Sequence, residues 1–146
     1  GLGAPHWDAD ARGVICGLTR GSNAGHLARA ALEGIAHQND DVLTAMIADS
    51  GSPLLALKVD GGAASNQLLM QLQADLLGCE IVRPQMLETT ALGSGIMAGL
   101  ATGIWSDLSE VSSRWAVDAR FTRKVDEDQV NQRRAGWQQA LKKTCT

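Results

Sequence analysis

Aromatic and basic clusters are both missing from this 146-residue chain. It has no tyrosine, one phenylalanine and four tryptophans, and its 13 lysines and arginines never occur in a run longer than two. Proteins that bind nucleic acids gather basic side chains on one surface, with aromatic residues between them. The formal net charge is −3. We therefore expect no nucleic-acid partner.

Metal-binding and disulfide patterns are also missing. Cys16, Cys79 and Cys145 are odd in number and far apart, so they form neither a CxxC pair nor a disulfide framework. None of the three histidines has a second ligand at the spacing that a metal cluster needs. We predict no metal site among these residues, and a cytoplasmic location.

No segment is long and apolar enough to span a membrane. The longest candidate, residues 91–105, has no charge but is only 15 residues long and rich in small side chains. We interpret it as a buried helix and expect no membrane partner. Gly93, Gly95, Gly99 and Gly103 destabilise such a helix by about 1 kcal/mol each, relative to alanine. Close packing against the sheet or a neighbouring helix is the expected compensation.

The length and the apolar fraction of 45% fit one globular domain over residues 1–146. Short apolar runs predict strands at 12–19, 54–59, 80–83 and 115–121. Helices are expected from a cap at Ser22 or Asn23 to residue 50, and over 68–77, 88–105 and 126–143. Alternating strands and helices are typical of an α/β fold with a largely parallel sheet.

Apolar periodicity selects one face of each longer helix for burial. In the first helix the apolar positions are Leu27, Ala31, Ile35, Val42 and Met46. In the next helix they are Leu68, Leu69, Leu72, Leu76 and Leu77, and Gly78 is placed to end that helix.

A Gly-Gly turn after the second strand is the first place that suggests chemistry. Backbone N–H groups are free at the start of a helix, and the missing Cβ atoms of Gly61 and Gly62 would let a phosphate approach them. Ligands of α/β sheets bind at this carboxyl end of the strands. A tight structural turn explains the same residues equally well. Asn66 could contact a nucleotide or simply occupy the first helical turn.

No catalytic residue is predicted. The carboxylates are typical of solvated, capping or ion-paired groups, and no nucleophile, histidine and acid can be grouped from their order along the chain.

Two segments resemble the C-terminal signature of the FGGY carbohydrate kinases. They are residues 13–18 (GVICGL) and, seven residues later, 26–33 (HLARAALE). Further segments are similar to the glycerol kinases of that family: 1–8 (GLGAPHWD), 60–62 (DGG), 69–71 (LMQ), 73–75 (QAD), 83–84 (RP), 88–93 (ETTALG) and 135–137 (AGW). The resemblance covers essentially the whole chain.

The resemblance implies an actin-like, ribonuclease-H-like ATPase fold in which two domains close over a cleft. ATP would lie mainly on the C-terminal domain, and glycerol would be phosphorylated to glycerol 3-phosphate with Mg²⁺ present. It assigns nucleotide binding to Gly61, Gly62, Ala63 and Asn66. The backbone of Gly62 and Ala63 would approach the phosphates and ribose, and Asn66 would contact the adenine side.

The same resemblance implies that parts are missing. The family's aspartate base, in a Gly-Asp-Gln motif, and its glycerol-binding residues lie upstream and have no counterpart here. We expect residues 1–146 to be an incomplete C-terminal domain without its first strands, inactive alone and prone to associate, as a homo-oligomer, through an unpaired sheet edge. His6 and His37 replace the family's usual tyrosines, and residues 94–96 also depart from its pattern.

Two other functions stay open at this point. One is another FGGY sugar kinase similar to the xylulokinases. Against it, the Asp60-Gly61-Gly62 sequence and the 83–84 and 88–90 segments fit the glycerol kinases better. The other is a non-catalytic module that binds a nucleotide or a protein partner.

Overall fold

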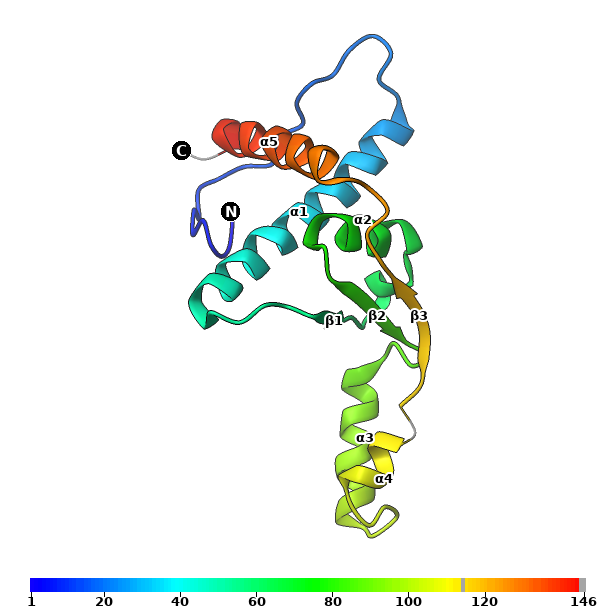
Figure 1. The fold of residues 1–146 in the computed structure, drawn as a ribbon. Coiled ribbons are helices and arrows are strands. Elements are labelled where there is room, and N and C mark those ends of the chain that lie inside the picture. The colour runs from blue at the N-terminus through cyan, green and yellow to red at the C-terminus, as the bar shows by residue number, and fades with distance from the viewer. Residues whose placement is uncertain (114, 145–146) are drawn as a thin grey trace.

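The computed structural model describes residues 1–113 and 115–144 as a small sheet with helices on it and one helical arm (Figure 1). In chain order its elements are α1 (Ala24–Ser50), β1 (Ala56–Lys58), the 3₁₀ helix η1 (Gly62–Ser65), α2 (Gln67–Leu77), β2 (Glu80–Pro84), α3 (Thr89–Ala101), α4 (Leu108–Ser113), β3 (Val117–Phe121) and α5 (Glu127–Thr144). The α/β class is as predicted, and the four predicted helices appear in order as α1, α2, α3 and α5, whereas η1 and α4 were not predicted.

The sheet has the strand order β1-β2-β3 and is mixed, not largely parallel as predicted. β1 runs parallel to β2, with Leu57 opposite Ile81, and β3 runs antiparallel to β2, with Phe121 opposite Ile81. The reversal occurs because the α3–α4 arm brings the chain back to the same end of the sheet before β3 begins (Figure 1). β2 is therefore the central strand, and its residues from Ile81 to Pro84 are all buried.

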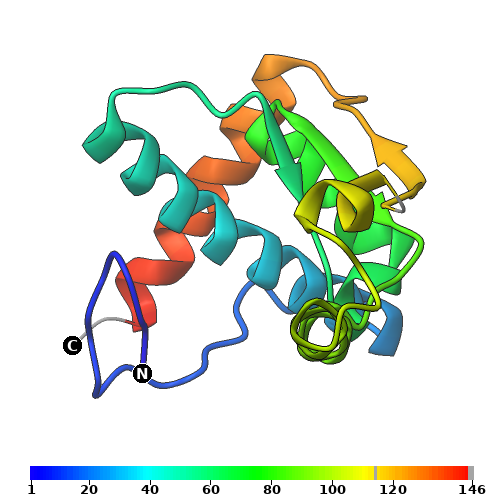
Figure 2. The ribbon, with the colours of Figure 1, turned by 90° about the horizontal axis from the view of Figure 1, so that it is seen from below.

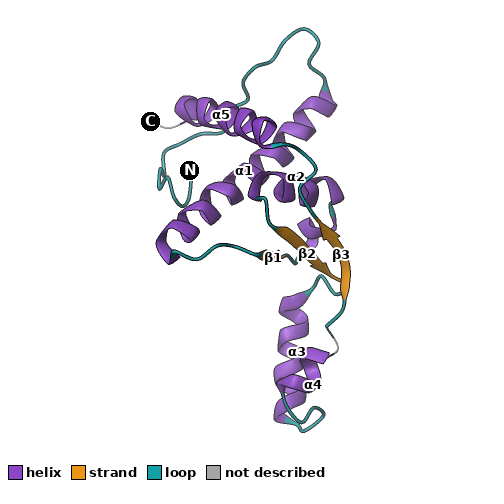
Figure 3. Ribbon diagram, in the orientation of Figure 1, coloured by secondary structure: helices purple, strands orange, loops and turns teal. Residues whose placement is uncertain are grey.

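The strand predicted at 12–19 is wrong. These residues form neither helix nor strand, and Val14, Ile15 and Leu18 are exposed (Figure 3). A strand needs neighbouring backbone groups to pair with. In the described part of the chain no strand lies beside this segment, so its apolar sequence has nothing to pair with.

The core lies between α2 and β2. Leu69, Leu72 and Leu76 of α2 are at most 2% exposed, and they meet Ile81 of β2 and Val130 of α5. The predicted end of α2 at Gly78 is confirmed, and its start lies one residue before the predicted position 68. The side chain of Asn66 caps its start, accepting from the Leu69 N–H at 3.1 Å, and Gly78 ends it with a left-handed φ of 67°.

α1 begins and ends as predicted, but the face predicted to be buried is wrong. Asn23 caps its start and Gly51 ends it at a φ of 64°. Leu27, Ile35 and Met46, however, are 41–58% exposed. The buried positions are Ala36, His37 and Asp40, on the face where α1 crosses α5 and α2 (Figure 2). Ala36 packs in the core with the leucines of α2, and Asp40 pairs with Arg134 on α5; periodicity within α1 identifies neither partner.

An ion pair joins α1 to α5. The carboxylate of Asp40 accepts from Nε of Arg134 at 2.8 Å and from its Nη2 at 2.7 Å. The same Nη2 donates to the carbonyl oxygen of Leu76 at 3.0 Å, so the guanidinium also reaches the end of α2. The Asp40 side chain is only 6% exposed, whereas that of Arg134 is 38% exposed.

A second carboxylate, Asp41, joins three segments. Its Oδ2 accepts from Nε1 of Trp137 on α5 at 2.7 Å, and His6 Nε2 lies 3.0 Å from the same oxygen. The ring of His37 stacks on Trp137, with ring centroids 5.3 Å apart. The N-terminal segment and the end of α5 therefore lie side by side, as Figures 1 and 2 both show.

The helix predicted to be buried at 91–105 is wrong in both length and burial. α3 ends at Ala101, and Gly99 is its only buried residue among those described. With α4 it extends away from the rest of the molecule (Figure 1). Met97 and Ile104 are 68% and 72% exposed. Within the described residues, no helix is long and apolar enough to cross a membrane.

Only one of the four glycines in this arm has the predicted close packing. A Cβ at Gly99 would lie 2.5 Å from the ring of Trp105, a neighbour in the same arm. A Cβ at Gly93 or Gly95 would meet nothing within 4 Å, and Gly103 instead adopts a φ of 76° after the helix end. The packing is therefore local and involves neither the sheet nor another helix.

Replacing Arg134 tests the α1–α5 ion pair. Arg134→Met leaves the Asp40 carboxylate buried without its partner, so we expect the free energy of unfolding to fall by about 2 kcal/mol. Urea unfolding followed by tryptophan fluorescence measures it. Arg29→Met is the matched control, since it removes an exposed pair with Glu33, and should cost at most about 0.5 kcal/mol. Equal losses of unfolding free energy in Arg134→Met and Arg29→Met would contradict the role of the Asp40–Arg134 ion pair in joining α1 to α5.

Candidate functional site: the turn between β1 and α2

The turn after β1 is held at its start by the connection that follows β2. Gly61 adopts a φ of 77°, a left-handed conformation that favours glycine. Its N–H donates to the carbonyl oxygen of Leu87 at 2.8 Å. The hydroxyl of Thr89 donates to the carboxylate of Asp60. The chain therefore enters η1 in one defined direction.

Free backbone donors follow immediately. Within residues 1–113 and 115–144, the N–H groups of Gly62 and Ala63 donate no hydrogen bond, and both residues are exposed. A Cβ at Gly62 would meet nothing within 4 Å, so the space above this backbone is open. Unpaired, exposed N–H groups at the start of a helical turn can bind an anion such as a phosphate.

One turn contains all the predicted site residues, but their hydrogen bonding differs. They are Gly61, Gly62, Ala63 and Asn66. The Gly61 N–H is already bonded to Leu87. Asn66 is exposed, and its side-chain oxygen caps α2. It therefore lies just before the first helical turn, where the sequence places it as the alternative to nucleotide contact. Gly62 and Ala63 remain as the residues with free donors, and their contact with a nucleotide stays a prediction.

Arg83 on β2 anchors the other end of this turn and was not among the predicted site residues. Its Nη1 donates to the carbonyl oxygen of Ala64 at 3.0 Å and lies 3.4 Å from that of Ser65. The residue is 8% exposed. One sequence signal could have identified it, namely a lone arginine in a short strand that is otherwise mostly apolar. A buried arginine needs several acceptors around it.

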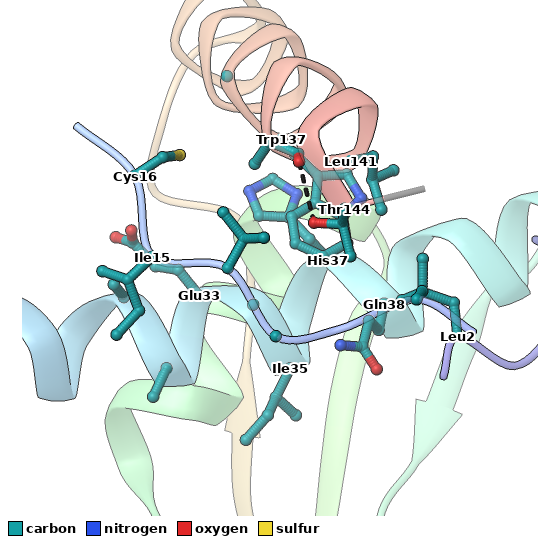
Figure 4. Close-up of a pocket in the computed structure, with 18 of the residues that line it drawn as sticks. Leu2, Ile15, Cys16, Glu33, Ile35, His37, Gln38, Trp137, Leu141 and Thr144 are labelled. Atoms are coloured by element: carbon teal, nitrogen blue, oxygen red, sulfur yellow. Dashed lines mark hydrogen bonds between the residues drawn. The ribbon is translucent and has the colours of Figure 1, made fainter. Parts of the chain in front are cut away.

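Two cavities lie near these elements. The larger, of about 600 Å³, lies away from the turn, between the segment 11–16, α1 and α5 (Figure 4). Val14, Ile15 and Leu27 contribute apolar walls. The smaller, of about 390 Å³, lies beside the turn and is lined by Asp60, Ala63 and residues of α1 and α2. Only the smaller one adjoins the free donors.

His37 lines the larger cavity, where burial lowers its pKa below the ordinary 6.5. The carboxylates of Asp40 and Asp41 oppose this shift but do not cancel it. A neutral imidazole stacked on Trp137 is a packing group and not a general acid near neutral pH.

The described residues offer no further reactive centre. No group of three or more metal-ligating side chains is assembled among them. Cys16 is exposed and Cys79 is buried, both as free thiols, and burial raises the pKa of Cys79. Cys145 lies outside the described residues. The turn can therefore bind an anion, and the carboxylate at its start, Asp60, is bonded to the Thr89 hydroxyl.

Comparison with known proteins identifies the family. The family described as "FGGY family of carbohydrate kinases, C-terminal domain" matches residues 1–102. The chain belongs to the FGGY family of carbohydrate kinases. The match confirms the resemblance seen in residues 13–18 and 26–33.

Among the sequence relatives of this FGGY chain are bacterial glycerol kinases. One from Burkholderia ambifaria (strain MC40-6) is 60% identical over 142 residues, and one from Paraburkholderia phytofirmans is 55% identical. Each alignment covers 97% of this chain but only 28% of the relative. The FGGY chain therefore spans about a quarter of the length of these enzymes.

Solved structures agree with this assignment. A Plasmodium falciparum glycerol kinase with ADP matches 100% of the chain, and 29% of its own length, at 35% identity and a TM-score of 0.86. A ligand-bound xylulose kinase from Lactobacillus acidophilus matches 94% of the chain, and 26% of its own length, at 29% identity and a TM-score of 0.67. The predicted actin-like ATPase fold is confirmed, as part of an FGGY C-terminal domain.

Lowering the pH tests the burial of His37. Because its pKa is lower when folded than the 6.5 of an exposed histidine, the unfolded chain binds more protons as the pH falls below that value, and stability falls with it. We expect the melting temperature to fall as the pH is lowered from 7.5 to 5.5. His37→Tyr keeps a ring to stack on Trp137 and should show a smaller fall. Identical pH dependence in both proteins would exclude His37 as the cause.

Proposed function

We propose that this chain is the nucleotide-binding part of a glycerol kinase, which transfers the γ-phosphoryl group of ATP to glycerol and gives glycerol 3-phosphate. The observation that carries the proposal is the 60% identity to a glycerol kinase over 97% of the chain. The higher TM-score with a glycerol kinase, 0.86 against 0.67 for a xylulose kinase, supports the same choice of substrate.

The role of these residues is to hold the nucleotide. Phosphoryl transfer depends mainly on positioning and on neutralising charge. The free N–H groups of Gly62 and Ala63 would bind phosphate oxygens or the ribose, and Asn66, exposed at the start of α2, would contact the adenine side. Mg²⁺, when bound with ATP, neutralises charge on the phosphates. No residue of this chain is assigned to the metal.

The remaining parts of the reaction would come from elsewhere in the protein. Because the chain spans 28% of its relatives' length, we propose that the catalytic base and the glycerol-binding residues lie outside it and that residues 1–146 alone do not catalyse transfer. We infer a cytoplasmic location, which the free thiol of the exposed Cys16 supports. We also infer self-association of the isolated chain, since β1 has one edge without a strand in the described part of the chain.

Substrate choice is tested with the longer protein that contains this chain. We expect ATP-dependent phosphorylation of glycerol, measured as ADP release, and little with xylulose or gluconate. Activity on xylulose or gluconate without activity on glycerol would support another FGGY sugar kinase instead. If ADP binds, as heat in calorimetry, but no substrate is phosphorylated, a non-catalytic nucleotide-binding module is the better description.

Gly62→Val tests the nucleotide site directly. A side chain here meets open space in the protein, so stability should be unchanged, whereas it would occupy the approach of the phosphates. We expect the KM for ATP to rise about tenfold or more. Gly136→Val on α5 is the control, because that position is also open but far along the chain from the turn. A normal KM for ATP in Gly62→Val would remove this turn from the nucleotide site.

A further inference from the structure

The guanidinium of Arg83 is fixed on three sides. On one side it bonds the turn, through Nη1 and the carbonyl oxygens of Ala64 and Ser65. On the second side its Nε and Nη2 both lie 2.7 Å from Oδ2 of Asp118 on β3. On the third, its central carbon lies 5.4 Å from the centre of the Phe121 ring. The side chain therefore has one orientation.

The register of the sheet aims this side chain at the turn. Arg83 lies opposite Ala119, and the pairing of β2 with β3 becomes irregular between Arg83 and Pro84. Irregularities of this kind re-aim side chains near functional sites. Pro84 lies opposite Val117, so Asp118 is the extra, unpaired residue of β3 at this irregularity, and its carboxylate reaches the guanidinium.

The turn is thus held at both ends and free in the middle. Asp60 and Gly61 are bonded to the segment after β2, and Ala64 and Ser65 are bonded to Arg83. Gly62 and Ala63, with their free N–H groups, lie between these two anchors. The N–H of Ala64 also donates to the carbonyl oxygen of Gly61 at 3.1 Å. Because Gly61 and Ala64 are both anchored and bonded to each other, the two residues between them have little freedom to rotate.

We propose that Arg83, oriented by Asp118, is a positioning residue for the nucleotide: it holds the turn in the conformation that presents the Gly62 and Ala63 N–H groups to the phosphates. This inference rests on the proposed nucleotide-binding role of the turn. Arginine suits the task because its planar fork bonds two carbonyls and a carboxylate together, which the single nitrogen of lysine cannot do in this geometry.

The test uses Arg83→Met and Arg83→Lys in the longer protein that contains this chain. Loss of the anchor lets the turn rotate away from its binding conformation. We expect the KM for ATP and the Kd for ADP in calorimetry to rise about tenfold in Arg83→Met, the size of one charged hydrogen bond. The KM for glycerol should stay within about twofold. Arg83→Lys should not restore ATP binding.

The matched control is Arg120→Met. Arg120 pairs with Glu80 across the same two strands, with Nη1 and Oε2 2.5 Å apart, but makes no bond to the turn. The Arg120→Met variant should leave the KM for ATP and the KM for glycerol unchanged. A purely structural role for Arg83 would lower kcat, through loss of folded enzyme, without separating the two KM values.

If Arg83→Met does not fold, Asp118→Asn tests whether the orientation of Arg83 affects nucleotide binding. Asp118 is 47% exposed, so its replacement should be tolerated, and we expect a rise of about threefold in the Kd for ADP. Unchanged nucleotide binding in Asp118→Asn, or equal changes in the KM for ATP and glycerol in Arg83→Met, would overturn the proposal. Wild-type protein that binds ADP but does not phosphorylate glycerol would overturn the substrate assignment alone, because ADP binding still tests Arg83.

Discussion

The structure depends on the pairing of β2, the central strand. It is the only element that bonds both other strands of the described sheet, and α2 packs its buried leucines against it. Ile81 contributes to the core, and Arg83 extends from the same strand to the turn after β1. Hydrophobic burial and the geometry of the candidate site therefore depend on a single register. A slip of one residue would move both Ile81 and Arg83 to the opposite face of the sheet.

Polar contacts hold α5 and the N-terminal segment on α1. α5 is a mostly polar helix with only Val130 and Leu141 buried, so apolar area alone cannot fix it on α1. Arg134 and Trp137 instead bond Asp40 and Asp41, two neighbouring carboxylates on α1. Such contacts are directional, and they orient α5 as well as hold it. His6 uses the same carboxylate, which brings the N-terminal segment to this junction.

The candidate site was predictable from sequence where it depends on backbone chemistry. The Gly-Gly turn and the helix end at Gly78 follow from residues a few positions apart, and the structure has both. Arg83 was not predictable in the same way. Its acceptors lie 18 and 19 residues away in the chain, and its carboxylate lies 35 residues away. Only the sheet brings these groups together.

By itself the sequence determined the four longer helices, the positions of most caps and breaks, and the family, because these depend on local residue types and on motif spacing. Tertiary structure alone decided that the sheet is mixed, that α1 buries Ala36, His37 and Asp40 in place of its apolar stripe, and that residues 12–19 form no strand. The reason is physical. A face is buried, or a strand forms, only where another segment supplies the partner atoms, and periodicity within one segment does not reveal that partner.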